Sequence, residues 1–120
     1  MCACGSGVSY EDCCGRFHGG EAAPTAEALM RSRYTAFVLR DSEYLLRTWD
    51  ARTRPPRLDF DPELRWTGLE VLKTVKGGVG DSMGMVHFRA HYETPEGGGV
   101  QEERSKFLRP EAGAAWVYVD

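Results

Sequence analysis

The sequence lacks the features that would place the protein in a membrane or an export pathway. None of its apolar runs approaches the roughly 20 residues that a membrane-spanning helix needs. The N-terminus also lacks the basic block followed by an apolar block that marks a secretory signal. These absences predict a cytoplasmic protein with no membrane partner, in a compartment where thiols stay reduced.

An excess of positive charge is missing as well. The 120 residues include 15 Lys and Arg against 18 Asp and Glu, which gives a formal net charge of −3. This balance argues against attraction of the whole surface to nucleic acid. The apolar share of 42% suffices for a core, so the length predicts one domain with at most a small appendage.

Cysteine is absent after residue 14, because all four cysteines stand in the segment MCACGSGVSYEDCCG. The pattern is C-x-C-x8-C-C, formed by Cys2, Cys4, Cys13 and Cys14. Two pairs of thiolates across a glycine-containing loop can surround one tetrahedral ion, and zinc is the usual choice. Four protein thiolates leave no position for water, so we expect one structural Zn²⁺ ion.

Two other interpretations of these cysteines stay open. Disulfides would require either a strained bond between the adjacent Cys13 and Cys14 or very small closed loops. A redox centre or another metal would use the same thiols. Zinc is preferred, because Gly5 and Gly7 permit positive φ and Ser6 offers a hydroxyl donor to sulfur, as a tight wrap around a metal requires.

The cysteine segment resembles the SEC-C motif, a small zinc-binding module with the pattern C-x-C-G-S-G, a tyrosine and C-C/H-G. The match covers the four cysteines, the Gly5-Ser6-Gly7 loop and Tyr10. A copy of the module in a protein-translocation ATPase contacts a protein partner and the ribosome. The resemblance therefore implies a protein partner for residues 1–19, the zinc knuckle. Metal should supply the folding free energy of this segment, and a chelator should disorder it while residues 20–120 stay folded.

Helical spacing follows the zinc knuckle. The stretch AEALMRSRYTAFVLR, with Thr25 as its N-cap, predicts a helix whose apolar arc centres on Phe37 and whose Arg31 points towards water. DSEYLLRTW predicts a shorter helix capped by Asp41 or Ser42. The segment DARTRPPRLDFDPE, rich in proline and charge, predicts a loop.

After residue 64 the pattern alternates, which predicts four antiparallel strands joined by tight turns. Their sequences are RWTGLEVLKTV, SMGMVHFRAHYET, VQEERSKFLRP and AAWVYVD, and GGVGD and PEGGG are expected turns. In the first strand we expect Leu69 and Val75 on one face and Trp66 on the other. In the second strand the apolar positions should face the helices, with His87 and His91 on the outer face.

Two helices followed by an antiparallel meander predict an α+β fold, with the N-terminal helices on one face of a curved sheet. This layout resembles the cone-shaped nuclear-transport-factor-2-like, or cystatin-like, fold. With the SEC-C motif, the segments PTAEALMRSRYTAFVLRDSEYLLRTW, WTGLEVL, VHFRAHY, ERSKFLR and WVYVD resemble the YchJ-like family of uncharacterised bacterial proteins. Residues 20–120 would then form the cone domain, for which the family implies no established reaction.

Such a cone can enclose a pocket. Its candidate residues here are Arg33, Tyr34, Trp49, Glu103 and Arg104. Arg33 shares the helix arc with Phe37, so its burial would be costly unless it pairs with Glu103 or Glu102. A structural ion pair, an exposed rim charge and an anion clamp in a ligand pocket all fit this placement. Whether the protein is an enzyme stays open, because no catalytic motif is readable.

Three functions are consistent with the sequence. The preferred one is a zinc-binding interaction or scaffold module. The first alternative is a small-molecule binder or enzyme that uses the cone pocket, and the second is nucleic-acid or ribosome binding through the knuckle. Nucleic acid is the least favoured partner, since it would need a basic patch made of Arg16, His18, Arg31 and Arg33. The outer face of the sheet is the expected surface for a homodimer.

Overall fold

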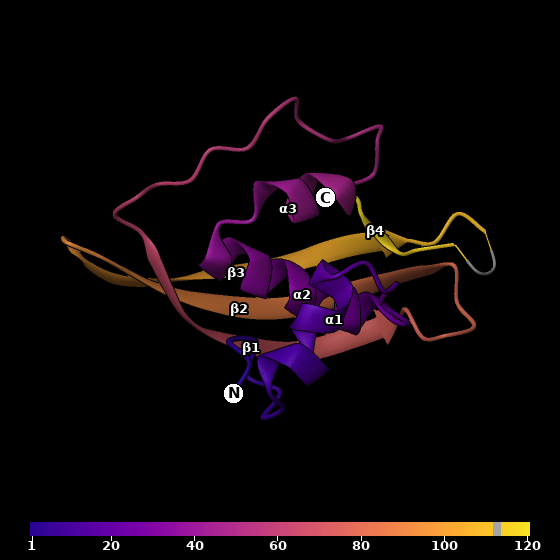
Figure 1. Cartoon of the computed structure of the whole chain (residues 1–120), viewed down its shortest axis with the longest axis horizontal. Coiled ribbons are helices and arrows are strands. Elements are labelled where there is room, and N and C mark those ends of the chain that lie inside the picture. Colours follow the sequence, from indigo (N-terminus) through magenta and orange to yellow (C-terminus); the bar gives the residue numbers. More distant parts are fainter. Residues whose placement is uncertain (112–113) are drawn as a thin grey trace.

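A computed structural model describes residues 1–111 and 114–120. Within these residues, three helices gather on one face of a four-stranded antiparallel sheet whose strands follow chain order (Figure 1). The helices are α1 (Cys14–His18), α2 (Ala26–Leu39) and α3 (Ser42–Arg47), and a 3-10 turn, η1 (Tyr10–Asp12), precedes α1. The strands are β1 (Arg65–Lys76), β2 (Met83–Thr94), β3 (Gly97–Leu108) and β4 (Val117–Tyr118). The expected α+β architecture is confirmed. In the described ranges no helix is long and apolar enough to cross a membrane.

The main helix α2 begins and ends where side chains and backbone replace its missing hydrogen bonds. Thr25 Oγ1 accepts a bond from Ala28 N at 3.0 Å, which confirms the expected N-cap. Arg40 ends the helix in the left-handed conformation, at a φ of 56°. Asp41 then caps α3 by accepting from Tyr44 N at 3.1 Å. Because only two residues separate α2 from α3, these caps set the direction of the second helix relative to the first.

Two opposite sides of α2 are buried, although its sequence pattern predicts a single apolar arc centred on Phe37. On the sheet side, the rings of Tyr34 and Phe37 pack against Trp66 of β1, with centroids 6.4 and 6.2 Å apart. On the other side, Ser32 and Thr35 are buried against α1 and α3. The N-terminal knuckle (residues 1–19) and the cone therefore share one continuous hydrophobic core, and α2 runs through it.

Two β-bulges in β1 change which side chains face the helices. The pairing of β1 with β2 is irregular after Trp66 and again after Val71. Each bulge adds one residue to β1, so the side chains beyond it change face. Trp66 and Leu69 therefore share the inner face, whereas Val75 lies on the outer face and is 41% exposed. The expected assignment, with Leu69 and Val75 opposite Trp66, is wrong because strict alternation does not hold through a bulge.

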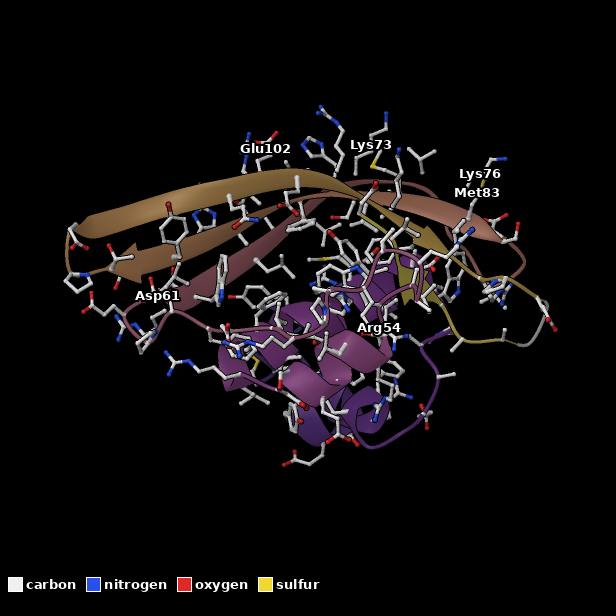
Figure 2. The ribbon with its side chains drawn as sticks, turned by 90° about the horizontal axis from the view of Figure 1, so that it is seen from above. Arg54, Asp61, Lys73, Lys76, Met83 and Glu102 are labelled. Atoms are coloured by element: carbon white, nitrogen blue, oxygen red, sulfur yellow. The ribbon has the colours of Figure 1, made fainter. Side chains whose placement is uncertain are left out.

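The second strand follows the predicted alternation. Val86, Phe88 and Ala90 are buried under the helices, and the histidines of this strand lie on the outer face. There His87 Nε2 lies 2.7 Å from Glu102 Oε2, and His91 Nε2 lies 2.6 Å from Glu70 Oε1. Figure 2 shows Glu102 projecting from the side of the sheet away from the helices. Each histidine thus has its own carboxylate on this face.

Two strand boundaries differ from those predicted. β3 begins at Gly97, inside the segment expected to be a turn. At Gly99 the Tyr92 ring covers the backbone, because a Cβ there would lie 2.5 Å from Tyr92 Oη and would displace that side chain. At the other end of the sheet, β4 is a strand of only two residues.

Candidate metal centre and cone cavity

The four cysteine sulfurs meet at one point beside α2. The Sγ atoms of Cys2, Cys4, Cys13 and Cys14 all lie within 4.8 Å of one another. Cys4 and Cys13 Sγ are 3.6 Å apart, and Cys13 and Cys14 Sγ are 3.9 Å apart. In a tetrahedral zinc site with four sulfur ligands at about 2.3 Å, the sulfurs are about 3.8 Å from one another. The four unpaired thiols therefore have the spacing of a ligand set for one metal ion.

Hydroxyl groups contact these sulfurs from two sides. Ser6 Oγ lies 3.1 Å from Cys13 Sγ, in line with the donor expected from the sequence. Thr35 Oγ1, in the middle of α2, donates to Cys14 Sγ at 3.3 Å and lies 3.6 Å from Cys2 Sγ. Hydrogen bonds of this kind orient metal ligands and stabilise thiolate charge. Thr35 thus brings the cone domain into the surroundings of the cysteine cluster.

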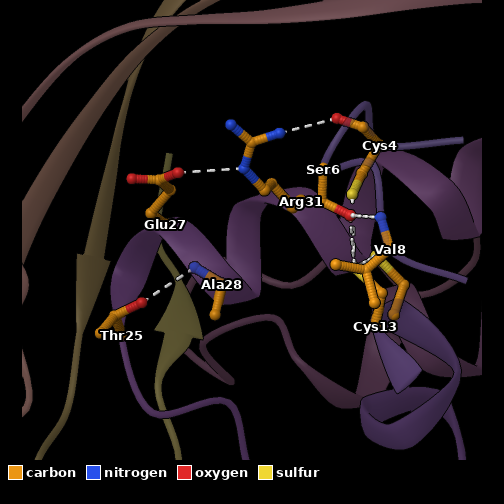
Figure 3. A network of polar contacts seen from close by, with 9 residues as sticks. Cys4, Ser6, Val8, Cys13, Thr25, Glu27, Ala28 and Arg31 are labelled. Carbon is orange, nitrogen blue, oxygen red and sulfur yellow. Dashed lines mark hydrogen bonds and ion pairs between the residues drawn. The ribbon is translucent and has the colours of Figure 1, made fainter. Parts of the chain in front are cut away.

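The loop between the two cysteine pairs has the backbone that a tight wrap needs. Gly5 and Gly7 both have a φ of +83°, a conformation that favours glycine. Cys2 N donates to Val8 O at 2.7 Å and closes the loop. Ser6 Oγ accepts a hydrogen bond from Val8 N at 3.3 Å and also contacts Cys13 Sγ (Figure 3). The same hydroxyl therefore fixes both the loop backbone and one of the cysteine side chains.

The proximity of the thiols changes how they titrate. The hydrogen bond from Cys14 lowers the pKa of the Cys4 thiol to about 4, with burial acting against this shift. The same contact, together with burial, raises the pKa of Cys14. The lowered pKa favours the thiolate form of Cys4, which is the form that binds a metal ion.

Arg31 ties the cysteine loop to α2. Its Nη1 donates to Cys4 O at 2.7 Å, and its Nε donates to Glu27 Oε2 at 3.0 Å (Figure 3). The side chain is 25% exposed and is directed at the loop, so the expectation that it points towards water is wrong. A guanidinium at this position offsets part of the negative charge that four thiolates would carry.

His18 holds α1 against α2. Its Nε2 lies 2.8 Å from Ser32 O and its Nδ1 lies 2.8 Å from Tyr10 Oη. A carbonyl only accepts, so Nε2 carries the proton, and in the neutral ring Nδ1 accepts from the Tyr10 hydroxyl. Because His18 and Arg31 are engaged in this way and Arg33 is buried, the four residues that nucleic-acid binding would need do not form one exposed basic surface.

A cavity of about 220 Å³ lies between α2 and the sheet. Four of the residues considered for a pocket line it: Arg33, Tyr34, Trp49 and Glu103. Arg104 does not, because successive side chains of a strand alternate and Glu103 takes the inward position. Arg104 pairs in register with His87 and is exposed on the outer face, which corrects its grouping with the pocket.

Arg33 does not form the ion pair that its burial led us to expect. It is 5% exposed, and its Nη1 donates to Leu45 O and Thr48 Oγ1, each at 2.7 Å. Its guanidinium carbon lies 5.1 Å from the Trp49 ring centroid and 4.5 Å from that of Tyr118. Burial lowers the pKa of Arg33 to about 10, so the side chain stays charged at neutral pH.

Both carboxylates proposed as partners of Arg33 are engaged elsewhere. Glu103 Oε1 accepts from Gln101 Nε2 at 2.6 Å on the wall of the cavity. Glu102 lies on the outer face, where it bonds to His87 and to Arg89. Within the described part of the chain the buried guanidinium therefore forms no ion pair and contacts neutral oxygens and aromatic rings, while Glu103 lines the same cavity.

The chain is similar to known proteins over its whole length. The family model described as the YchJ middle NTF2-like domain matches residues 25–120. UPF0225 proteins of Streptomyces coelicolor and Corynebacterium glutamicum are 61% and 52% identical, over 99% and 98% of this chain and 92% of each relative. The solution structure of a SEC-C motif containing protein from Rhodopseudomonas palustris has a TM-score of 0.83 at 33% identity, covering 99% of this chain and 94% of that one. A crystal structure of a SEC-C motif containing protein from Psychrobacter arcticus has a TM-score of 0.79 at 30% identity, covering 99% and 78%.

Proposed function

The chain belongs to the YchJ-like (UPF0225) family, and on this premise we propose that its four cysteines bind one structural zinc ion that holds the knuckle as a docking surface for a protein partner. The observation that carries the proposal is the convergence of four sulfurs within 4.8 Å, three of them on buried residues. Four thiolates complete a tetrahedral shell, so zinc at this site would hold structure and would leave no position for a substrate.

Zinc would give the knuckle a fixed shape that its own side chains do not provide. Beyond the cysteines, few apolar residues of this segment enter the core, chiefly Phe17. In comparably small modules metal binding supplies the folding free energy, on the order of 10 kcal/mol. The hydroxyls of Ser6 and Thr35 and the Arg31 cation would then orient the ligands and balance their charge.

The outward side of the knuckle supports the docking role. Its sulfurs face α2, whereas residues 5–9 and 11–12 stay exposed. Val8 is 44% exposed and stands near two exposed carboxylates, those of Glu11 and Asp12, in the sequence. An apolar side chain beside acidic groups is suited to a protein surface that offers an apolar contact flanked by Lys or Arg.

Capture of partners from a lysate of the source organism, with quantitative mass spectrometry, tests the docking role. Cys13→Ser should lose the partner together with zinc, and Val8→Asp should lose the partner while keeping zinc. Arg104→Ser, an exposed change on the outer sheet face, is the matched control and should keep both. A partner retained by Val8→Asp, or no reproducible partner at all, would overturn the docking role, and the zinc content of each variant tests the metal site separately.

A further inference from the structure

We propose that the cone cavity binds a small organic acid, with its carboxylate on Arg33 and an apolar, planar body between the aromatic walls. The site is distinct from the zinc knuckle. Arg33 and Thr35 are two residues apart, which places them about 200° apart around α2. Thr35 contacts the cysteine sulfurs, whereas Arg33 lines the cavity. One helix therefore separates two sites, and the second does not depend on the proposed docking role.

The first observation is a buried cation without a counter-ion. Arg33 uses only Nη1 in hydrogen bonds within residues 1–111 and 114–120, and both acceptors are neutral oxygens. The edge formed by Nε and Nη2 has no partner there. This edge of a guanidinium matches a carboxylate, which accepts two parallel hydrogen bonds from it. Since burial of a charge is costly without a partner, an anion in the cavity would remove that cost.

The second observation is an unsatisfied donor beside the first. Trp49 Nε1 is buried and has no hydrogen-bond partner among the described residues. Trp49 lines the same cavity, and its ring centroid lies 5.1 Å from the guanidinium carbon of Arg33. Buried N–H groups nearly always have an acceptor, from protein, water or ligand. The unpaired edge of Arg33 lines the cavity and is a donor, so a ligand here should bring acceptors, as a carboxylate does.

The walls set the rest of the ligand's chemistry. Besides Trp49, the aromatic lining residues are Tyr34, Phe37, Trp66, Phe88, Phe107 and Tyr118. Such walls favour a planar apolar body. The cavity, of about 220 Å³, is smaller than the roughly 300–1,000 Å³ of sites for drug-sized molecules, so the acid must be small. Glu103 on the wall would repel a second negative charge, which restricts the ligand to a monoanion.

The experiment uses phenylacetate, its neutral analogue phenylacetamide, and inorganic phosphate as probes of the full-length protein. Binding is followed by the NMR signal of the Trp49 indole N–H, assigned with Trp49→Phe. We expect phenylacetate to shift this signal saturably, and phenylacetamide and phosphate to leave it unchanged at the same concentrations. Equal shifts with acid and amide, a phosphate shift as large as that of the acid, or no shift with phenylacetate would each overturn the proposal.

Variants locate the acid in the cavity. Arg33→Lys keeps the positive charge but loses the paired donors, and should weaken phenylacetate binding by at least about tenfold. Arg104→Lys, the same change on the outer face, is the control and should bind as the wild type does. Glu103 takes no part in the hydrogen bonds that hold α3. Glu103→Gln should therefore leave the fold intact and strengthen phenylacetate binding, because it removes a negative charge that repels the carboxylate. Unchanged binding in Arg33→Lys, or weaker binding in Glu103→Gln, would contradict the placement.

Discussion

Arg31 Nη1 donates a 2.7 Å hydrogen bond to the backbone carbonyl of Cys4, which lies 27 residues earlier in the chain. The donor belongs to α2 of the cone, and the acceptor belongs to the loop that brings the cysteines together. Thr35 makes a second link of the same kind, to the sulfur of Cys14. The surroundings of the cysteine cluster are thus completed by the cone, and the two parts should influence each other's stability.

The Thr35 hydroxyl gives the first test of this link. Thr35→Val keeps the shape of the side chain but removes the donor to Cys14 Sγ, so we expect zinc to bind about 10–100-fold more weakly. Competition with a chromophoric chelator measures the affinity. Thr67→Val, at an exposed position of β1, is the matched control and should bind zinc as the wild type does. Equal affinity in the two variants would show that the hydroxyl does not act on the metal site.

Arg31 gives a second test, of stability. Arg31→Met removes the hydrogen bonds to Cys4 O and Glu27, which are partly shielded from solvent, and should lower the free energy of unfolding by about 1–2 kcal/mol. Urea unfolding of the zinc-loaded protein measures this loss. Arg57→Met breaks only an exposed pair with Asp59 and should change the stability little. A loss no greater in Arg31→Met than in Arg57→Met would rule out Arg31 as a tie between knuckle and cone.

Removal of metal tests the shared core. A chelator should disorder residues 1–19 and leave the strands folded, but it should also lower the Tm of the cone. The reason is that Cys4, Cys14 and Phe17 are buried in the same core as Leu29 of α2. Far-UV circular dichroism, recorded on heating with and without chelator, follows the cone. A cone whose Tm is indifferent to chelation would contradict a shared core, and complete unfolding at room temperature would contradict a self-sufficient sheet.

The outer face of the sheet gives a pH-dependent prediction. Hydrogen bonds from Arg89 and then His87 lower the pKa of Glu102 from 4.5 to about 2. A carboxyl whose pKa is depressed by folding stabilises the protein above its unfolded-state pKa, and this stabilisation disappears as the pH falls through the folded-state value. The Tm difference between wild type and Glu102→Gln should therefore be largest above pH 4.5 and shrink towards pH 2, and added salt should reduce it. A difference that stays constant from pH 6 to pH 2 would contradict the ion pairs.

Local signals in the sequence predicted the features that depend on neighbouring residues. The cysteine spacing predicted the cluster, the capping residues Thr25 and either Asp41 or Ser42 were predicted from their positions, and the alternation of β2 gave the correct faces. Each of these is decided within a few positions of the chain. The bulges of β1 also lie within one strand, but they leave no periodic signature, which explains the wrong face for Trp66.

Contacts between distant residues could not be predicted in the same way. In the sequence, Thr35 is an ordinary position of the predicted helix. The structure shows that residues 1–19 cover it. The available signal was that α2 carries Ser32 and Thr35 opposite the arc centred on Phe37, where a solvent-facing helix would have long charged side chains. The helix arc left a buried and an exposed Arg33 both open, and the structure shows it buried; its partners come from α3 and from aromatic rings, to which no pairing rule for charges leads.

The most direct test of the account is the metal content of the purified protein, measured by elemental mass spectrometry together with thiol counting. The wild type and Ser9→Ala should each carry one zinc ion per chain, since Ser9 lies in the loop without contacting sulfur. Cys13→Ser should lose the zinc, because the shell of four thiolates is broken. Absence of zinc from the wild type, with its cysteines free or oxidised, or full zinc retention in Cys13→Ser, would contradict the assignment of the four cysteines as a structural metal site.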